Sequence, residues 1–424
     1  MILLNNLEDY KNLKLSLKKV LINYLRFTIK NVPFYSKILK QKDIEKVSAK
    51  DFFHFPITYD HNLLENPFSF VSRNAKIVQL SSSGGTYDKR KIIFRTNSDI
   101  RRSIKTSTKM FLCGGLKSKD KIAILQPFDL WDIGHLALMT FRQIGALSIP
   151  VGLSLSNEGI LDFLKFIKCN VIYSTPSKAS ILAELSKKNN QRLKIEKVFC
   201  AGEPILPTCR DTIKEIWGSE IYGIYGSEET DGIGAECEYR CGYHIFDEDL
   251  IIEILNPNTL LPVNDNKGAL VITKLNYKGT VLIRYLLGDL VEITTETCQC
   301  GSKIPRIFPR GRIKEVIWLY DGRKITLSAF ENVLEEVLYI VPQYQILVEN
   351  TQKGNILLIK VKIKRGRILK EKLTKIFSRT SQDLEEGINK GEIKLSLQLD
   401  ENVVFKLTDR GKIPKIIYKE NKSK

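Results

Sequence analysis

The order of hydrophobic and polar positions predicts helices at the start of the chain and an alternation of strands and helices after them. From residue 5 to residue 45, leucine and isoleucine recur at helical spacing among lysines, which predicts amphipathic helices. Pro33 is expected to end one of them, because proline disrupts the helical turn before it. Strand-like apolar runs at residues 122–125, 171–173 and 198–200 are separated by helical stretches. This alternation predicts an α/β core with parallel strands.

The pattern changes after Glu248, where short apolar runs alternate with turn sequences. Residues that favour turns, chiefly Asn, Pro, Asp and Gly, cluster at residues 256–258, 264–268 and 276–279. Short strands separated by such turns predict an antiparallel β portion.

The last section of the chain, from about Arg312, has a mixed pattern. A hairpin-like turn sequence at residues 319–322 precedes a helical pattern near residues 327–338, and strand-like runs and a lysine-rich tail follow. The predicted fold class is therefore α/β. We expect a large N-terminal domain at residues 1–311, with mixed and parallel sheets plus the β portion, and a small α+β C-terminal domain at residues 312–424.

Composition and charge favour a globular protein with a solvated surface. The chain has 424 residues, more than a single hydrophobic core usually organises, so two or more domains are expected. A hydrophobic content of 43% is sufficient for packed interiors. No run of 18 or more uncharged apolar residues occurs, so we expect neither a spanning helix nor a signal peptide and predict a cytoplasmic location. The net charge of +18 comes from scattered lysines accompanied by 48 acidic residues, so we expect no nucleic-acid partner and no membrane partner.

A loop of small and hydroxylated residues at positions 81–91 runs directly into cations. Its sequence is Ser-Ser-Ser-Gly-Gly-Thr-Tyr-Asp-Lys-Arg-Lys. Glycines let backbone N–H groups converge on anionic oxygen, hydroxyls add donors, and Lys and Arg add charge, so the loop is a candidate polyphosphate site. The alternative is a flexible linker, because such runs are common in linkers and this one is not a Walker loop.

The cysteines indicate a second kind of site. Four of the eight cysteines form two short pairs, Cys237 with Cys241 and Cys298 with Cys300, and His244 lies close to the first pair. A cytosolic protein is not expected to use structural disulfides, so the spacing favours one structural Zn²⁺ held by the four cysteines, with His244 as a possible replacement for one of them. Buried free thiols are the alternative, and a redox sensor is a third.

Six motifs, in order, together resemble the adenylate-forming superfamily of acyl-coenzyme A synthetases and peptide-synthetase adenylation domains. The first is the loop at residues 81–91, and the others are Ala201-Gly202-Glu203-Pro204, Tyr225-Gly226-Ser227-Glu228-Glu229, Ile283 to Leu290, Gly311-Arg312-Ile313-Lys314-Glu315 and Asp409-Arg410-Gly411-Lys412-Ile413. One branch, the phenylacetate-coenzyme A ligase family, is most similar, through Asn31 to Tyr35, Thr175-Pro176-Ser177, the segment from Cys237 to Asp249, and the Cys298/Cys300 pair.

The resemblance implies an ATP-dependent acid–thiol ligase. Such an enzyme joins a carboxylic acid to AMP with the help of Mg²⁺ and then transfers the acyl group to coenzyme A. A relative that loads a carrier protein or an amine differs only in the acceptor, and the sequence does not separate the two. A basic zinc-containing nucleic-acid-binding protein is the alternative from another class, although no recognised binding module is visible. A homodimer is possible.

The resemblance also implies site residues. Those expected at the ATP phosphates are Ser82, Ser83, Gly84, Thr86 and Arg90, although Tyr87 and Lys89 depart from the family loop. Glu229 matches the Mg²⁺-binding glutamate, while Glu228 stands where the family has a hydroxyl. The residues expected around adenosine are Ala201, Gly202, Glu203, Tyr222, Tyr225 and Gly226 at the base, and Asp289 and Arg312 at the ribose. Core packing is the alternative for either tyrosine, and an ordinary turn is the alternative for Asp289.

Two lysines and one aromatic segment complete the implied site. Lys412 matches the lysine that reaches the carboxylate and the α-phosphate, and Lys314 matches the hinge about which the small, mobile domain turns. Residues placed beside the acyl group are Phe128, Trp131, Ile133 and His135, with Gly134 leaving space for a flat ring. This lining favours an aromatic acid, and ordinary core packing is the alternative for it.

Overall fold

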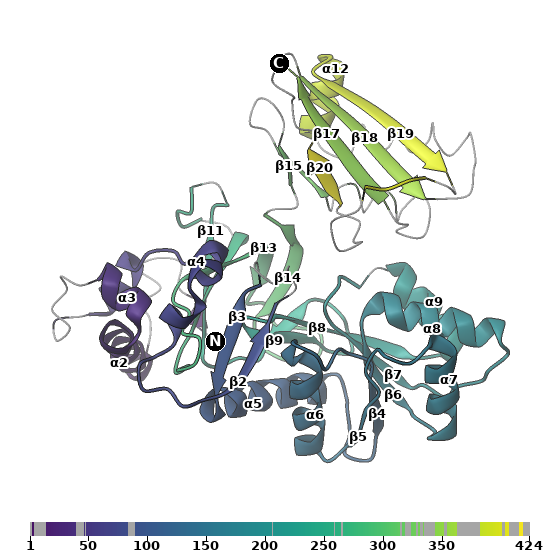
Figure 1. Ribbon diagram of the computed structural model, residues 1–424, viewed down its shortest axis with the longest axis horizontal. Coiled ribbons are helices and arrows are strands. Elements are labelled where there is room, and N and C mark those ends of the chain that lie inside the picture. Colours follow the sequence, from purple (N-terminus) through teal and green to yellow (C-terminus); the bar gives the residue numbers. More distant parts are fainter. Residues whose placement is uncertain are drawn as a thin grey trace. The chain divides into compact units, whose positions relative to one another are not determined.

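The computed structural model shows two compact units, Met1–Pro309 and Arg310–Lys424 (Figure 1). Each unit has an apolar core of its own. The residues that the structure describes are 2–3, 14–39, 46, 48–83, 90–205, 207–257, 259–263, 266–313, 316–318, 324–327, 330, 334, 344–351, 354–362, 382–400, 403–406 and 415–418. No helix among these residues is long and apolar enough to cross a membrane.

The first unit begins with the predicted amphipathic helices. Helix α2 (Leu15–Asn31) ends just before Pro33, which is the first residue of α3 (Pro33–Ile38). The prediction for Pro33 is confirmed. Short helices follow, and they are a 3-10 helix at Ala49–His54, α4 at Asp60–Glu65 and a second 3-10 helix at Pro67–Phe70.

The predicted parallel core is present in the first unit. Its strands are β4 (Lys121–Ile124), β5 (Leu147–Pro150), β6 (Val171–Ser174), β7 (Lys197–Cys200) and β8 (Glu220–Ser227). They lie in the order β5-β4-β6-β7-β8, and every neighbouring pair is parallel. The α/β prediction is confirmed here, because the helices that connect the strands cover both faces of this sheet.

Alternate residues of these strands face different helices. Ala123 packs in one cluster with α7 (Asn157–Phe166), α8 (Pro176–Lys188) and α9 (Pro207–Trp217). Its neighbour Ile124 packs in another cluster with Phe111 of α5 (Asn97–Cys113) and Phe141 of α6 (Asp132–Ile144). Figure 1 shows α7, α8 and α9 on the side of these strands away from α6. This burial on both faces explains why the strands are continuous apolar runs.

An antiparallel portion, predicted only after Glu248, extends the same sheet beyond β8 and begins earlier, with two strands that were not predicted. Its strands are β9 (Asp231–Glu236), β10 (Tyr243–Ile245), β11 (Leu250–Leu255), β12 (Lys267–Lys274), β13 (Tyr285–Thr294) and β14 (Arg306–Arg312). The sheet order is β1-β11-β12-β13-β14-β10-β9-β8, where β1 is Ile2–Leu3. Strands β11, β12 and β13 form an antiparallel meander, as the turn sequences predicted.

A separate two-stranded sheet carries the candidate phosphate loop. Strand β2 (Ile77–Ser82) pairs antiparallel with β3 (Ile92–Thr96), and Ser82 lies opposite Ile92. The loop therefore leaves and re-enters at one end of this hairpin. Residues 84–89 lie outside the described residues.

The second unit contains a four-stranded sheet, a helix and a small hairpin. The sheet order is β19-β18-β17-β20, from strands β19 (Ile393–Asp400), β18 (Gly354–Lys362), β17 (Tyr344–Thr351) and β20 (Ile416–Tyr418). The hairpin is β15 (Val316–Trp318) with β16 (Lys324–Thr326), and the helix is α12 (Gln382–Asn389). The predicted α+β composition is confirmed. The predicted turn at residues 319–322 and most of the predicted helix near 327–338 lie outside the described residues.

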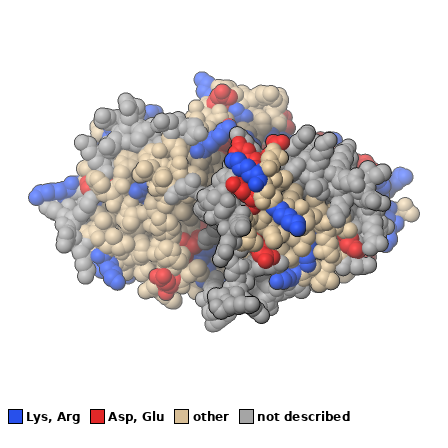
Figure 2. Space-filling view, turned by 90° about the horizontal axis from the view of Figure 1, so that it is seen from above, with Lys and Arg blue, Asp and Glu red and all other residues tan. Residues whose placement is uncertain are grey.

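Positive and negative charges are mixed on the surface. On the face drawn in Figure 2, lysine and arginine side chains lie close to acidic ones. Two lysines of α5 contact a single glutamate, because Lys105 Nζ lies 2.9 Å from one Glu248 oxygen and Lys109 contacts the other. Such exposed pairs stabilise the fold little but neutralise one another at the surface.

Candidate active site and candidate metal centre

Both ends of the candidate phosphate loop are held by hydrogen bonds. The Ser83 N–H donates to the Lys91 carbonyl at 3.0 Å, and the Ser82 N–H donates to the Leu130 carbonyl at 2.7 Å. Arg90 Nη1 lies 3.5 Å from the Ser82 hydroxyl, and the Arg90 guanidinium lies 5.9 Å from the centre of the Trp131 ring. Arg90, predicted to bind phosphate, therefore lies between Ser82 of the same loop and Trp131, which was predicted to line the acid pocket. Gly84 and Thr86 lie outside the described residues.

Glu229 is buried and forms an ion pair with the lysine that ends the loop. Lys91 Nζ contacts Glu229 Oε1 and lies 3.1 Å from Asp60 Oδ1. The Tyr285 hydroxyl donates to the same two carboxylates, at 3.2 Å to Glu229 and 2.5 Å to Asp60. Burial acts to lower the pKa of Lys91, but the charges of Glu229 and Asp60 outweigh it and raise that pKa above its ordinary value. The ammonium therefore stays charged.

Glu228 faces a different, deeply buried cation, Arg95. Arg95 Nη2 lies 3.7 Å from Glu228 Oε1 and donates to the Glu228 carbonyl at 2.9 Å. The same guanidinium lies 2.6 Å from Asp231 Oδ1 and 3.2 Å from Asp132 Oδ2. Arg95 thus joins β3, the turn between β8 and β9, and the start of α6. A side chain with five donors in a fixed plane is suited to three acidic partners.

The crowding of carboxylates around Arg95 changes their proton affinity. Burial raises the pKa of Glu228 from 4.5 to about 7, although Arg95 and the Ser81 hydroxyl act to lower it. Burial also acts to raise the pKa of Asp231, but Arg95 and Lys274 hold it at about 2. The Asp231 carboxyl is therefore ionised and the Glu228 carboxyl is half protonated near neutral pH.

Tyr225 and Asp289, both predicted at the adenosine, are in direct contact. The Tyr225 hydroxyl donates to Asp289 Oδ2 at 2.6 Å, and Asp289 is 8% exposed. The next residue, Gly226, begins a close turn, since a Cβ there would lie 2.1 Å from the Asp231 carbonyl oxygen. Tyr222 differs from the prediction. It lies in the apolar core and stacks on Phe199, because positions 222 and 225 of β8 point to opposite faces of the sheet.

The segment Ala201-Gly202-Glu203 follows β7 at the carboxyl end of the parallel strands. Ala201 is buried, whereas Gly202 and Glu203 are exposed. The Ser177 N–H donates to Glu203 Oε2 at 3.2 Å, and this bond holds the segment against the start of α8. Loops at the carboxyl ends of parallel strands are the usual ligand sites in such sheets.

The predicted acid-binding residues surround the start of α6. His135 Nε2 lies 2.7 Å from the Phe128 carbonyl oxygen, and the rings of these two residues meet edge to face at 5.3 Å. Ile133 packs against the apolar core. The prediction of free space beside Gly134 is wrong, because a Cβ there would lie 2.4 Å from the Pro127 carbonyl oxygen and 3.1 Å from the Phe128 ring. The chain itself fills that space.

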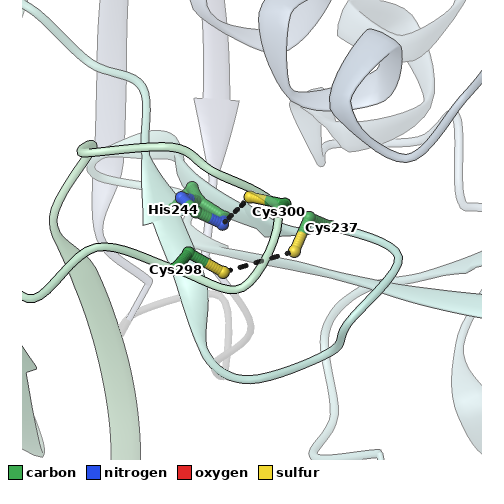
Figure 3. Close-up of side chains that lie close together, drawn as sticks. All are labelled: Cys237, His244, Cys298 and Cys300. Carbon is green, nitrogen blue, oxygen red and sulfur yellow. Dashed lines mark hydrogen bonds between the residues drawn. The ribbon is translucent and has the colours of Figure 1, made fainter.

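Three cysteines and His244 converge on one point, as Figure 3 shows. Their ligand atoms all lie within 4.8 Å of one another. The Cys237 and Cys298 sulfurs are 3.8 Å apart, and the Cys300 sulfur lies 3.6 Å from His244 Nε2. Cys237 follows β9, His244 lies on β10, and the other two precede β14, which are neighbouring strands.

The four groups differ from the four cysteines predicted from spacing. His244 takes the place of Cys241, whose sulfur lies 3.3 Å from that of Cys298 and 3.1 Å from Arg306 Nη1. The reason is the alternation of β10, which turns the His244 ring toward the cysteines. Burial acts to raise the pKa of Cys298, but hydrogen bonds from the Cys300 N–H and neighbouring thiols hold it at about 7. Burial lowers the pKa of His244, which favours the neutral imidazole.

Three predicted residues belong to the C-terminal part of the chain. Arg312 is exposed at the end of β14. Lys314 and Lys412 lie outside the described residues, so their roles stay predictions. Four residues of the candidate site were not predicted from the sequence. Two of them, Lys91 and Tyr285, lie inside motifs already noted, whereas nothing in the local sequence marks Asp60 or Arg95.

The chain is similar in sequence and in fold to known acyl-coenzyme A ligases. No protein-family model matches the chain. It is 27% identical to a phenylacetate-coenzyme A ligase of Thermus thermophilus over 335 residues, 76% of this chain and 75% of the relative. It is 25% identical to the Escherichia coli protein of that name over 357 residues, 81% of each chain. A crystal structure of 2-hydroxyisobutyryl-CoA ligase with an acyl-AMP superposes with a TM-score of 0.73 at 20% identity, covering 95% of this chain and 90% of the other.

Proposed function

Because the chain is similar to phenylacetate-coenzyme A ligases over 76% and 81% of its length, we propose that it belongs to this branch of the adenylate-forming superfamily and activates a carboxylic acid with ATP. The acid and ATP form an acyl-adenylate and pyrophosphate, and the acyl group then passes to the thiol of coenzyme A with release of AMP. The observations that carry this proposal are two contacts made by one segment, residues 225–229. Lys91, at the end of the candidate phosphate loop, contacts Glu229, and the Tyr225 hydroxyl donates a hydrogen bond to Asp289.

Each part of this site is suited to one part of Mg·ATP. Ser82, Ser83 and Arg90 would hold the phosphates, because hydroxyl, amide and guanidinium donors match anionic oxygens. Asp289, oriented by Tyr225, would accept hydrogen bonds from the ribose hydroxyls. Glu229 offers a hard carboxylate oxygen of the type that Mg²⁺ prefers. When bound, Mg²⁺ would neutralise charge on the departing pyrophosphate.

The remaining charge at the reacting carboxylate is assigned to Lys412. A flexible point charge can enter for adenylation and leave for thioester formation, which requires the second domain to move about Lys314. Phe128, Trp131, Ile133 and His135 are proposed to surround an aromatic acid, since ring stacking and apolar contact favour a flat substrate.

We also propose that Cys237, His244, Cys298 and Cys300 hold one structural Zn²⁺. Zinc bonds of about 2.3 Å to sulfur and about 2.0–2.1 Å to nitrogen imply tetrahedral edges of about 3.8 Å and about 3.6 Å. The observed S···S and S···N distances are 3.8 Å and 3.6 Å. Four protein ligands close the coordination sphere, so the ion would link β9, β10 and β14 rather than take part in the reaction.

The decisive experiment is carboxylate-dependent exchange of labelled pyrophosphate into ATP, with arylacetic, benzoic and short aliphatic acids. Exchange that requires an aryl acid, followed by thioester formation only when coenzyme A is added, is the expected result. Exchange without thioester formation would instead favour a carrier protein or an amine as acceptor. No exchange with any acid would contradict the proposed function. The homodimer and the cytoplasmic location stay predictions.

A further inference from the structure

Lys91 forms an ion pair with Glu229, the carboxylate that the proposed function assigns to a metal. Its ammonium contacts Glu229 Oε1, and the side chains are 19% and 4% exposed, respectively. Glu229 Oε1 also accepts the Tyr285 hydroxyl hydrogen bond at 3.2 Å. The oxygen that would bind Mg²⁺ therefore already has a cation and a hydrogen-bond donor.

A second carboxylate lies within reach of the same ammonium. Lys91 Nζ lies 3.1 Å from Asp60 Oδ1, and the Tyr285 hydroxyl lies 3.4 Å from Lys91 Nζ and 2.5 Å from Asp60 Oδ1. Tyr285 thus joins the two acids, and Lys91 lies between them. If Lys91 leaves Glu229, Asp60 still neutralises its charge, so the lysine need not return to water.

A divalent ion and an ammonium cannot share one carboxylate oxygen at low cost. The two cations would repel one another strongly at this distance in a site from which water is largely excluded. Lys91 also ends the candidate phosphate loop, and the Ser83 N–H bonds its carbonyl at 3.0 Å. A movement of the Lys91 side chain away from Glu229 would therefore take place at the base of the loop that would hold the polyphosphate.

We propose that Lys91 is a resident counter-ion that competes with the divalent cation for Glu229 and moves to Asp60 and the polyphosphate when metal and nucleotide bind together. This inference rests on the proposed function, because it takes Glu229 as the metal-binding carboxylate. In the absence of nucleotide, Lys91 keeps the affinity of Glu229 for free metal low. Metal then binds well only together with the phosphates that give Lys91 an alternative partner, so Lys91 is a positioning residue.

The test is a titration with Mn²⁺ as the probe, followed by electron paramagnetic resonance at pH 8 without nucleotide. Lys91→Met should bind one Mn²⁺ at least about tenfold more tightly than the natural chain, because two carboxylates lose their cation. The matched control is Lys76→Met, since Lys76 is exposed at the opposite end of the same hairpin and the charge change is identical. Unchanged or weaker Mn²⁺ binding by Lys91→Met would overturn the proposal.

Two further variants keep the test decisive. Adding Glu229→Gln to Lys91→Met should remove the gain, and a gain that persists would show that the metal binds elsewhere. Lys91→Gln, which retains a polar group of similar length, serves if the methionine variant does not fold, and the same tenfold gain is expected from it. Pyrophosphate exchange by the natural chain is measured separately. If the natural chain catalyses exchange but Lys91→Met binds Mn²⁺ no more tightly than the natural chain, only the role of Lys91 is contradicted. If Lys91→Met binds Mn²⁺ more tightly but the natural chain catalyses no exchange, only the proposed function is contradicted.

Discussion

The hydroxyl of Tyr225 donates a 2.6 Å hydrogen bond to Oδ2 of Asp289, which lies 64 residues further along the chain. This bond restricts the orientation of the Asp289 carboxylate. A carboxylate that must accept hydrogen bonds from a ribose benefits from such a support, because less conformational freedom is lost when the ligand binds.

Tyr225→Phe should therefore weaken ATP binding. Loss of one hydrogen bond to a charged group costs about 1.5 kcal/mol, which corresponds to about a tenfold rise in the KM for ATP. The KM for the acid should change little. Pyrophosphate exchange at varied ATP concentration measures the effect, and Tyr239→Phe, at an exposed tyrosine, is the control. Equal rises in both KM values would argue against a role at the ribose.

The raised pKa of Glu228 makes stability depend on pH. The folded chain keeps the Glu228 proton up to about pH 7, whereas the unfolded chain loses it near pH 4.5. The folded state therefore binds more protons in this window, and the free energy of unfolding falls as the pH rises through it.

Glu228→Gln removes this penalty because glutamine resembles the protonated acid. Between pH 4.5 and pH 8, the free energy of unfolding of the variant should rise by about 3 kcal/mol relative to that of the natural chain. Urea unfolding at several pH values measures the difference. Glu238→Gln is a suitable control, since Glu238 is exposed. A constant difference across this range would show that Glu228 is ionised throughout in the folded chain.

The proposed metal centre includes Cys237, Cys298 and Cys300 but leaves out Cys241. Cys298→Ser should lower zinc content and the melting temperature together, because metal binding is linked to folding. Cys241→Ser should keep about one zinc per chain, since Cys241 lies outside the group of four. Elemental analysis and thermal unfolding of protein purified without added metal provide both readings. Loss of zinc from both the Cys298 and the Cys241 variants would instead favour the four-cysteine set.

The lysine near the end of the chain should act in one half-reaction only. Lys412→Ala is expected to abolish pyrophosphate exchange while thioester formation from a supplied acyl-adenylate continues, because the charge is needed only where the carboxylate attacks. Lys394→Ala, at an exposed lysine of β19 in the same unit, is the control. Equal loss of both half-reactions would remove Lys412 from this role.

Local pattern was sufficient to predict most of the elements. Strands β4, β6 and β7 appear in the sequence as short apolar runs, because both faces of this parallel sheet are covered. Pro33 separates two helices because its ring acts on the residues next to it. Such effects depend on consecutive residues and can be read without knowing what lies opposite them.

Ordered motifs indicated the function but did not determine every contact. Tyr222 and Tyr225 are three residues apart, and only the direction of β8 decides that one enters the core and the other meets Asp289. Likewise, cysteine spacing indicated a metal centre, but the register of β10 against β9 and β14 decides that His244 joins it.

The periodicity of the elements, the order of the motifs and the kinds of donor available follow from the amino-acid sequence alone. Which charged groups meet depends on how the chain folds. Lys91 reaches Glu229 and Asp60, and Arg95 reaches Glu228 and Asp231, across segments that are distant in sequence. A single charge has no periodicity, so its partner is set by the packing of separate strands and helices rather than by its neighbours in the chain.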